Sequence, residues 1–196
     1  MIATHITFGA YGFWLPNDPR GSWSDTVRSP ELLRHGAATK TIETQSVAHV
    51  PHDHARRLAA KADLKFKPVR FTGIQARAIG RGFAAYAAQS GLTIHACAIM
   101  PDHIHLVVAE HRLTPKSLTI QLKGHAVRQL VEEGIHPLAD HQREDGRVEK
   151  CFATGEWIVY LDTANDVLRA TQYVEENPEK GGLRRQTWWF VKPFQP

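Results

Sequence analysis

Two apolar, β-prone runs separated by a two-residue turn restrict the possible folds of this chain more than any other feature. The first run extends from Leu92 to Met100 and the second from His103 to Ala109. Pro101-Asp102 lies between them, and proline followed by aspartate is typical of a tight turn. Two strands joined by so short a turn pair with each other, so the sequence predicts a β-hairpin here.

Regular segments flank this hairpin on both sides, and each has the periodicity of a strand or of an amphipathic helix. The predicted segments are a strand over 2–8, a helix from Gly73 that ends before Gly91, a helix over 113–134, a strand over 157–161, and a helix over 163–177 that Pro178 ends. The order is therefore βαββαβ followed by one more helix. It predicts an α+β, ferredoxin-like fold, in which an antiparallel sheet carries helices on one face and the last helix is added at the C-terminal end.

The length of 196 residues corresponds to one domain, and we expect a single domain over 1–196. A loop-rich insertion at about 17–70 interrupts it. This insertion is polar and has no clean periodicity, and we expect loops with a short helix near 55–62. The last segment, at about 178–196, is predicted to be an aromatic and basic tail.

The composition excludes several classes of protein. With 42% hydrophobic and 22% charged residues, the chain resembles neither collagen nor a disordered tail nor a coiled coil. Its two cysteines form no CxxC pair, which argues against a disulfide framework and a cysteine-based zinc site. No apolar run approaches 18 residues and no secretory signal pattern is visible, so we expect a cytoplasmic protein that does not enter a membrane. The net charge of +4 is compatible with a nucleic-acid partner but does not establish one.

His103 and His105 are the strongest candidates for chemistry. Side chains two residues apart on a strand point to the same face, so both imidazoles can reach one divalent metal ion. The alternative is one surface histidine beside one hydrogen-bonded, half-buried histidine. A complete site needs further ligands, and the sequence does not decide whether His95, His111 or His125 supplies one.

Tyr173 and Asn177 form a second candidate pair, on the last predicted helix. Residues four apart share a helix face, so a phenol and an amide oxygen would lie side by side. An amide oxygen suits a hard cation such as Mg²⁺ or Mn²⁺. The alternatives are a packing aromatic and an ordinary residue at the end of a helix before Pro178.

Several segments resemble single-tyrosine HUH transposases (His, bulky hydrophobe, His) of the insertion-sequence-200-like kind, and in particular their REP-associated branch. The similarity covers both ends and most of residues 90–190, but little of 25–70. Two motifs carry it in the expected order, and shorter segments support it. The segments are Met100–Val108 (MPDHIHLVV), Tyr173–Leu183 (YVEENPEKGGL), Thr4–Phe8 (THITF), Trp14–Trp23 (WLPNDPRGSW) and Trp188–Val191 (WWFV).

The resemblance implies a reaction and a set of residues. Enzymes of this family cleave single-stranded DNA, usually next to a hairpin, through a tyrosine that forms a 5′-phosphotyrosine and leaves a free 3′-OH. It implies Tyr173 as nucleophile, with Mg²⁺ or Mn²⁺ bound by His103 and His105. A polar residue one turn after the tyrosine supplies a third ligand in related enzymes. Asn177 occupies that position here, where some members have glutamine.

The resemblance also implies a partner, namely single-stranded DNA hairpins, REP-type palindromes among them. For each residue that we expect at the DNA, a solvated charge or a packing aromatic is the alternative. These residues are Trp14, Arg20, Lys116, Lys123, Arg128, Arg184, Arg185 and Trp188. A domesticated or non-transposing hairpin-binding protein is the alternative function. A histidine-triad hydrolase is disfavoured because Val107 stands where that motif needs histidine. The sequence leaves monomer and homodimer open.

Overall fold

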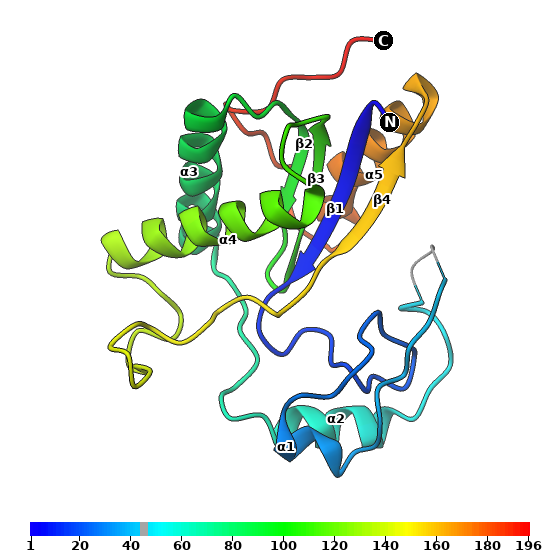
Figure 1. Cartoon of the computed structure of the whole chain (residues 1–196), viewed down its shortest axis with the longest axis vertical. Helices are drawn as coiled ribbons and strands as arrows, with labels where there is room; N and C mark the ends of the chain where they lie inside the picture. The colour runs from blue at the N-terminus through cyan, green and yellow to red at the C-terminus, as the bar shows by residue number, and fades with distance from the viewer. Residues whose placement is uncertain (44–46) are drawn as a thin grey trace.

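The computed structural model describes residues 1–43 and 47–196, and its centre is a four-stranded antiparallel sheet in the order β2-β3-β1-β4 (Figure 1). This is the strand order of the ferredoxin-like fold, and the α+β class predicted from the sequence is confirmed. In chain order the elements are β1 (Ala3–Gly9), α1 (Pro30–Leu33), α2 (His54–Ala62), α3 (Gly73–Ser90), β2 (Ile94–Ile99), β3 (His103–Ala109), α4 (Pro115–Glu132), β4 (Trp157–Leu161) and α5 (Ala164–Lys180).

The register of the sheet follows from the hairpin and from the central strand. Met100 donates its backbone N–H to the carbonyl of His103, which closes the turn between β2 and β3. The first strand, β1, lies between β3 and β4, and its Thr7 is paired with His105 on one side and with Trp157 on the other. Residues from three distant parts of the sequence therefore meet across the middle of the sheet.

Each face of the sheet is covered by different helices, because side chains alternate along every strand. Large apolar residues such as Ile6, Phe8 and Leu106 form the main core together with residues of α3 and α4. The opposite face carries smaller side chains, including Ala96 and Ala98, and packs against α5. The prediction of two helices on one face is thus confirmed for α3 and α4, with the last helix on the other face (Figure 1).

The last helix extends one turn further than predicted. Pro178 lies inside α5, which continues to Lys180, so the predicted end at residue 177 was wrong. A proline costs the helix one backbone hydrogen bond and crowds the carbonyl four residues earlier, and in the last turn no long stretch of helix has to continue past that distortion. The backbone N–H of Gly181 bonds to the carbonyl of Asn177, and that of Leu183 to Pro178, which completes the helix end.

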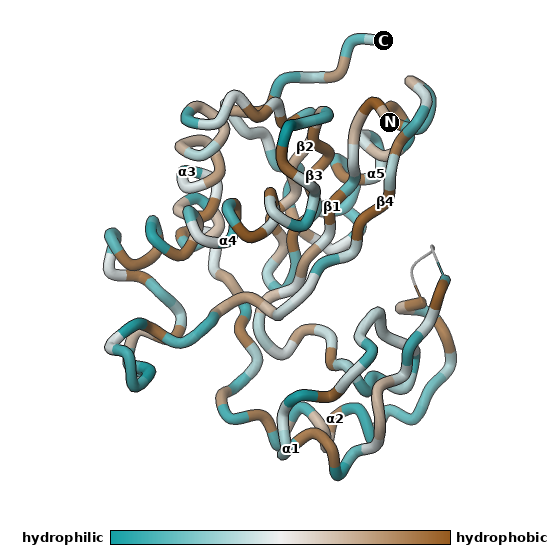
Figure 2. The backbone as a smooth tube through the Cα atoms, in the orientation of Figure 1, coloured by the Kyte–Doolittle hydropathy of each residue, from teal (hydrophilic) through white to brown (hydrophobic). Residues whose placement is uncertain are grey.

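The predicted insertion forms a layer at one end of the sheet and contains α1 and α2 (Figure 1). Its own small cluster consists of Leu15, Leu32 and Ala60. Figure 2 shows hydrophobic residues along the strands of the sheet, whereas the loop that follows α4 is largely hydrophilic.

The C-terminal tail covers the exposed edge of β2. The side chain of Gln186 accepts a hydrogen bond from the backbone N–H of Ile99 and donates one to its carbonyl, both at 2.8 Å. Further along, the N–H of Lys192 bonds to the carbonyl of Ile94. An open strand edge invites pairing with other chains, so the tail protects this edge. Within 1–43 and 47–196, no helix combines the length and the hydropathy needed to cross a membrane.

Candidate active site

His103 and His105 lie side by side on the α5 face of β3, as the alternation of the strand predicts. Their ring centroids are 4.8 Å apart and the rings are nearly perpendicular. His105 is buried, with 6% of its surface exposed, whereas His103 is partly open to solvent. This spacing allows one nitrogen of each ring to face the same ion.

The environment of His105 keeps its ring neutral and fixes its orientation. Its Nδ1 lies 2.9 Å from the hydroxyl of Thr7 and 3.2 Å from Nε2 of His5. Burial lowers the pKa of His5 to about 4, and burial followed by repulsion from His103 and His5 lowers that of His105 well below its ordinary value. Because the partners on β1 engage Nδ1, they leave Nε2 of His105 as the nitrogen for a ligand.

A carboxylate holds the second imidazole. Nδ1 of His103 donates to Oδ1 of Asp102 at 2.7 Å, and the other oxygen of Asp102 accepts from Arg70 at 3.0 Å. Burial acts to raise the pKa of Asp102, but the hydrogen bond and charge of His103 and the charge of Arg70 outweigh it, so this pKa is lowered. The ring of Phe13 stacks on His103 with centroids 4.9 Å apart.

Tyr173 reaches the histidines from α5. Its ring centroid lies 5.5 Å from that of His105 and 5.8 Å from that of His5, in edge-on arrangements. The residue is 40% exposed, so part of its surface is accessible to a large substrate. The ammonium of Lys180 lies 5.5 Å from the ring centroid, within the range of a cation–π contact.

The donor set fits a divalent metal ion. Across the described residues, neither His103 nor His105 has a hydrogen-bond partner at Nε2, while Nδ1 of each is engaged as is usual for metal-bound histidine. The described part of the chain contains no cluster of three histidine, cysteine or acidic residues suited to a metal. Asn177, which the sequence suggests as a further ligand, is half-buried one turn after Tyr173.

The other histidines considered as ligands have partners elsewhere. Nδ1 of His95 bonds to the carbonyl of Lys192 in the tail, and His111 lies 3.3 Å from the carbonyl of Ser90. His125 lies on α4, on the opposite face of the sheet, and contacts the ring of Tyr86. None of the three is brought to His103 and His105.

Of the residues predicted to contact DNA, Arg184 and Arg185 follow shortly after the end of α5 in the chain. Both are exposed, and Arg185 forms an ion pair of 2.6 Å with Glu175 of α5. Trp188 follows in the tail but packs inward, since a Cβ on Gly80 would meet its ring at 2.5 Å. The neighbouring Trp189 is 66% exposed.

Three predicted contacts lie on α4, on the face of the sheet opposite α5. Lys116 and Arg128 are exposed there. The ammonium of Lys123 instead donates to the carbonyls of Ala153 and Gly155, at 3.0 and 2.7 Å. Burial lowers the pKa of Lys123 to about 8. The structure thus ties this lysine to the segment before β4.

The last two predicted contacts belong to one compact turn in the insertion. Arg20 donates to both carboxylate oxygens of Asp18 at 2.8 Å, and its side chain is only 9% exposed. Its guanidinium lies 3.8 Å from the ring centroid of Trp14, whose indole N–H donates to the carbonyl of Gly21. In this arrangement Trp14 and Arg20 shape the turn.

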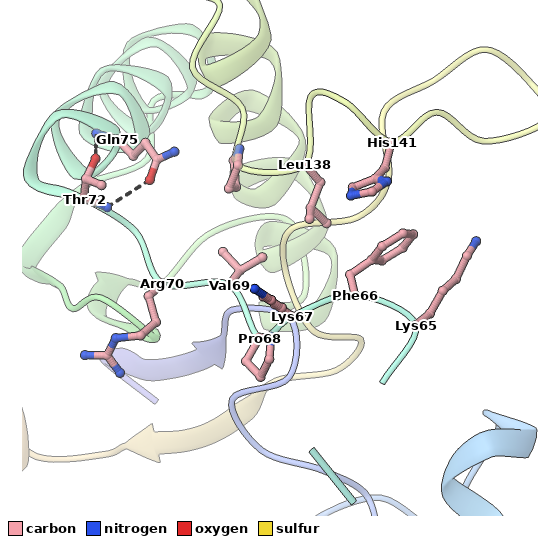
Figure 3. Close-up of a pocket in the computed structure, with 11 residues that line it drawn as sticks. Lys65, Phe66, Lys67, Pro68, Val69, Arg70, Thr72, Gln75, Leu138 and His141 are labelled. Carbon is pink, nitrogen blue, oxygen red and sulfur yellow. Dashed lines mark hydrogen bonds between the residues drawn. The ribbon is translucent and has the colours of Figure 1, made fainter. Parts of the chain in front are cut away.

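A cavity of about 600 Å³ is lined by residues that include Arg70 and Phe66 (Figure 3). Arg70 lines the cavity and also bonds to Asp102, the carboxylate that holds the imidazole of His103. Phe66 and His141 face each other in it with ring centroids 4.6 Å apart. Its other lining residues are Lys65, Lys67, Pro68, Val69, Thr72, Gln75, Pro137 and Leu138.

Sequence reasoning missed His5, Thr7 and Asp102 as parts of the site. A signal for the first two was present, because His5 and Thr7 alternate with Ile6 and Phe8 and therefore share the polar face of β1. What the sequence did not provide was the register that pairs Thr7 with His105.

No protein-family model and no curated protein matches the chain. Several solved structures are similar to it, and two of them are described as transposases. A REP-associated tyrosine transposase bound to a REP hairpin aligns with 93% of this chain and 70% of its own, at 11% identity and a TM-score of 0.48. A protein from Deinococcus radiodurans R1 that is designated a transposase aligns over 89% of both chains, at 13% identity and a TM-score of 0.38.

Proposed function

We propose that this protein is a single-tyrosine HUH transposase of the REP-associated branch, which cleaves and rejoins single-stranded DNA next to a hairpin. One observation carries the proposal. The helix at 164–180 brings a solvent-accessible phenol, Tyr173, against the paired imidazoles of β3, with ring centroids 5.5 Å apart at His105. A nucleophile beside two same-face histidines fits covalent catalysis of phosphoryl transfer.

In the proposed reaction the hydroxyl oxygen of Tyr173 attacks a DNA phosphorus atom. The bond from this oxygen to phosphorus forms, the bond from phosphorus to O3′ breaks, and the phenol proton passes to solvent while the released O3′ takes one up. The products are a 5′-phosphotyrosine and a free 3′-OH, and the reverse attack rejoins strands without another energy source. Mg²⁺ or Mn²⁺, when bound by His103, His105 and Asn177, would polarise the phosphate oxygens.

Substrate binding is proposed to combine an exposed basic tail with more distant contacts. Arg184 and Arg185 adjoin the tyrosine helix and suit the phosphates next to the cleaved bond. Lys116 and Arg128 lie on the other face of the sheet, so contact with them requires a substrate that extends around the molecule. Trp14, Arg20, Lys123 and Trp188 would act mainly by shaping the surface around them.

The test is formation of a covalent adduct between the protein and a single-stranded hairpin oligonucleotide in the presence of Mg²⁺ or Mn²⁺. We expect an adduct that survives denaturing electrophoresis, and we expect Tyr173→Phe to abolish it while hairpin binding persists. Tyr160→Phe is the matched control, because Tyr160 is also exposed but lies on β4, outside the histidine cluster. An adduct formed by Tyr173→Phe would refute the assignment of the nucleophile, and binding without any cleavage by the unmodified protein would favour the non-transposing alternative.

A further inference from the structure

Two tryptophans from distant parts of the chain stack beside the histidine cluster. Trp157 begins β4 and is paired with Thr7, so both side chains lie on the α5 face of the sheet. Thr7 is the residue whose hydroxyl meets His105 at 2.9 Å. Trp23, from the insertion, stacks on Trp157 with ring centroids 5.1 Å apart and an angle of 30°. The aromatic pair is therefore one strand away from Thr7, whose hydroxyl contacts the imidazole of His105.

The backbone at Ser22 and Trp23 is held by the segment 39–41. The N–H of Ser22 donates to the carbonyl of Thr39, and the N–H of Thr41 donates to the carbonyl of Ser22, both at 2.8 Å. The ammonium of Lys40 donates to the carbonyl of Trp23 itself. These bonds fix the backbone that carries Trp23, and stacking on Trp157 positions the indole before any ligand arrives, which lowers the entropic cost of binding.

The pair keeps surface open to solvent and has an unused donor. Trp23 is 39% exposed although it is stacked. The indole N–H of Trp157 is buried and has no hydrogen-bond partner among the residues that the structure describes. The helix α5 packs mainly over β2 and β3, so it leaves the β4 side of this face less covered.

We propose that Trp23 and Trp157 form a stacking platform for one unpaired nucleobase next to the cleaved phosphate. This inference rests on the proposed function and specifies how the single strand is held there. A flat, exposed indole accepts any base through its π face, so the platform contributes affinity and position with little sequence discrimination. Its place one strand from Thr7 would set the distance from the stacked base to the phosphate at His105 and Tyr173.

The experiment measures binding in the Tyr173→Phe background, which removes cleavage. The probe is a fluorescent DNA hairpin with a single-stranded flank, in which an abasic site replaces each flank nucleotide in turn. We expect one flank position where the abasic site lowers affinity about 5- to 150-fold. Trp23→Ala should lower affinity for the intact probe by a similar factor, and the abasic site at that position should then have no further effect.

Two further variants separate stacking from a structural role. Trp23→Phe keeps an aromatic face and should retain part of the affinity together with the sensitivity to that one abasic site. Trp189→Ala removes an exposed tryptophan of the tail. Any loss of DNA affinity in this variant should add to the loss caused by the abasic site. If the losses of Trp23→Ala and of every abasic site were additive, the platform would be excluded while the proposed function stood. Absence of any affinity for the hairpin would overturn both.

Discussion

The phenol ring of Tyr173 meets the imidazole of His105 edge-on, with centroids 5.5 Å apart and ring planes at 90°. This relationship depends on how closely α5 approaches the sheet. The strand β2 presents Ala96 and Ala98 to α5, and these small side chains leave room for Val174 to pack against the sheet. The adjacent Tyr173 is thereby held at the edge of the helix, where its ring reaches the histidines and its surface stays accessible.

The two histidines proposed as metal ligands should differ in their effect on stability although both are needed for cleavage. We expect His103→Ala and His105→Ala each to abolish the DNA adduct while hairpin binding persists. His105→Ala also empties a buried site and leaves Thr7 without its 2.9 Å partner, which should cost about 2–3 kcal/mol of unfolding free energy. His103 is more exposed, so its replacement should cost less. Urea denaturation measures both, and equal losses would contradict this account of His105.

Asp102 should tune metal affinity through His103. The variant Asp102→Asn removes the negative charge that orients the imidazole, and we expect a roughly 10- to 100-fold weaker affinity for Mn²⁺. Calorimetric titration with Mn²⁺ gives this affinity without DNA, and the Mn²⁺ concentration for half-maximal adduct formation gives it with DNA. Arg70→Gln is the control, because Arg70 touches only the far oxygen of the carboxylate and should have a smaller effect. Unchanged Mn²⁺ affinity in Asp102→Asn would remove Asp102 from this role.

The sheet could be predicted from sequence because its signals are local. The alternation of His103-Ile104-His105 and the Pro101-Asp102 turn set the hairpin without knowledge of the rest of the chain. The same holds for the start of α5, where Thr163 accepts from the N–H of Asp166 and caps the helix. The end of α5 was missed because Pro178 is a helix breaker by local rules, yet burial stabilises it in the last turn.

The environment of the candidate site could not be predicted, because it depends on register and on contacts between distant segments. Nothing local specifies that Thr7 lies opposite both His105 and Trp157. The environment of a single charged side chain also depends on distant residues. The ammonium of Lys123, for example, donates to carbonyls 30 and 32 residues away. Its position on an amphipathic helix predicted a surface cation in contact with DNA or with solvent.

Lys123 should give the protein a distinct pH dependence of stability. Its pKa is lowered by burial from 10.5 to about 8, so between these values the unfolded chain holds a proton that the folded chain lacks. The unfolding free energy therefore rises with pH through this window, by roughly 2–3 kcal/mol. The variant Lys123→Met cannot show this rise. The measurement is urea denaturation of both proteins at pH 8 and pH 10.5, and parallel pH profiles would contradict the burial of the ammonium.

Gly82 and Gly124 should respond oppositely to the same substitution, although both lie inside helices. A Cβ on Gly82 of α3 would lie 2.7 Å from the carbonyl oxygen of His125 and 2.8 Å from backbone atoms of Ala126, so α3 and α4 would have to separate. We expect Gly82→Ala to cost about 1–3 kcal/mol. Gly124 of α4 has nothing within 4 Å of the added methyl group, and alanine there should stabilise the helix by about 0.5–1 kcal/mol.

Urea denaturation of the two glycine variants measures this difference, provided that the dependence on urea concentration stays the same as in the unmodified protein. Because each variant adds one methyl group to a helical glycine, helix propensity favours alanine equally in both, and the contact between α3 and α4 accounts for the opposite signs. A stabilising effect of Gly82→Ala would mean that the two helices do not pack as closely as the structure describes. A destabilising effect of Gly124→Ala would mean that the exposed side of α4 is covered in the folded protein.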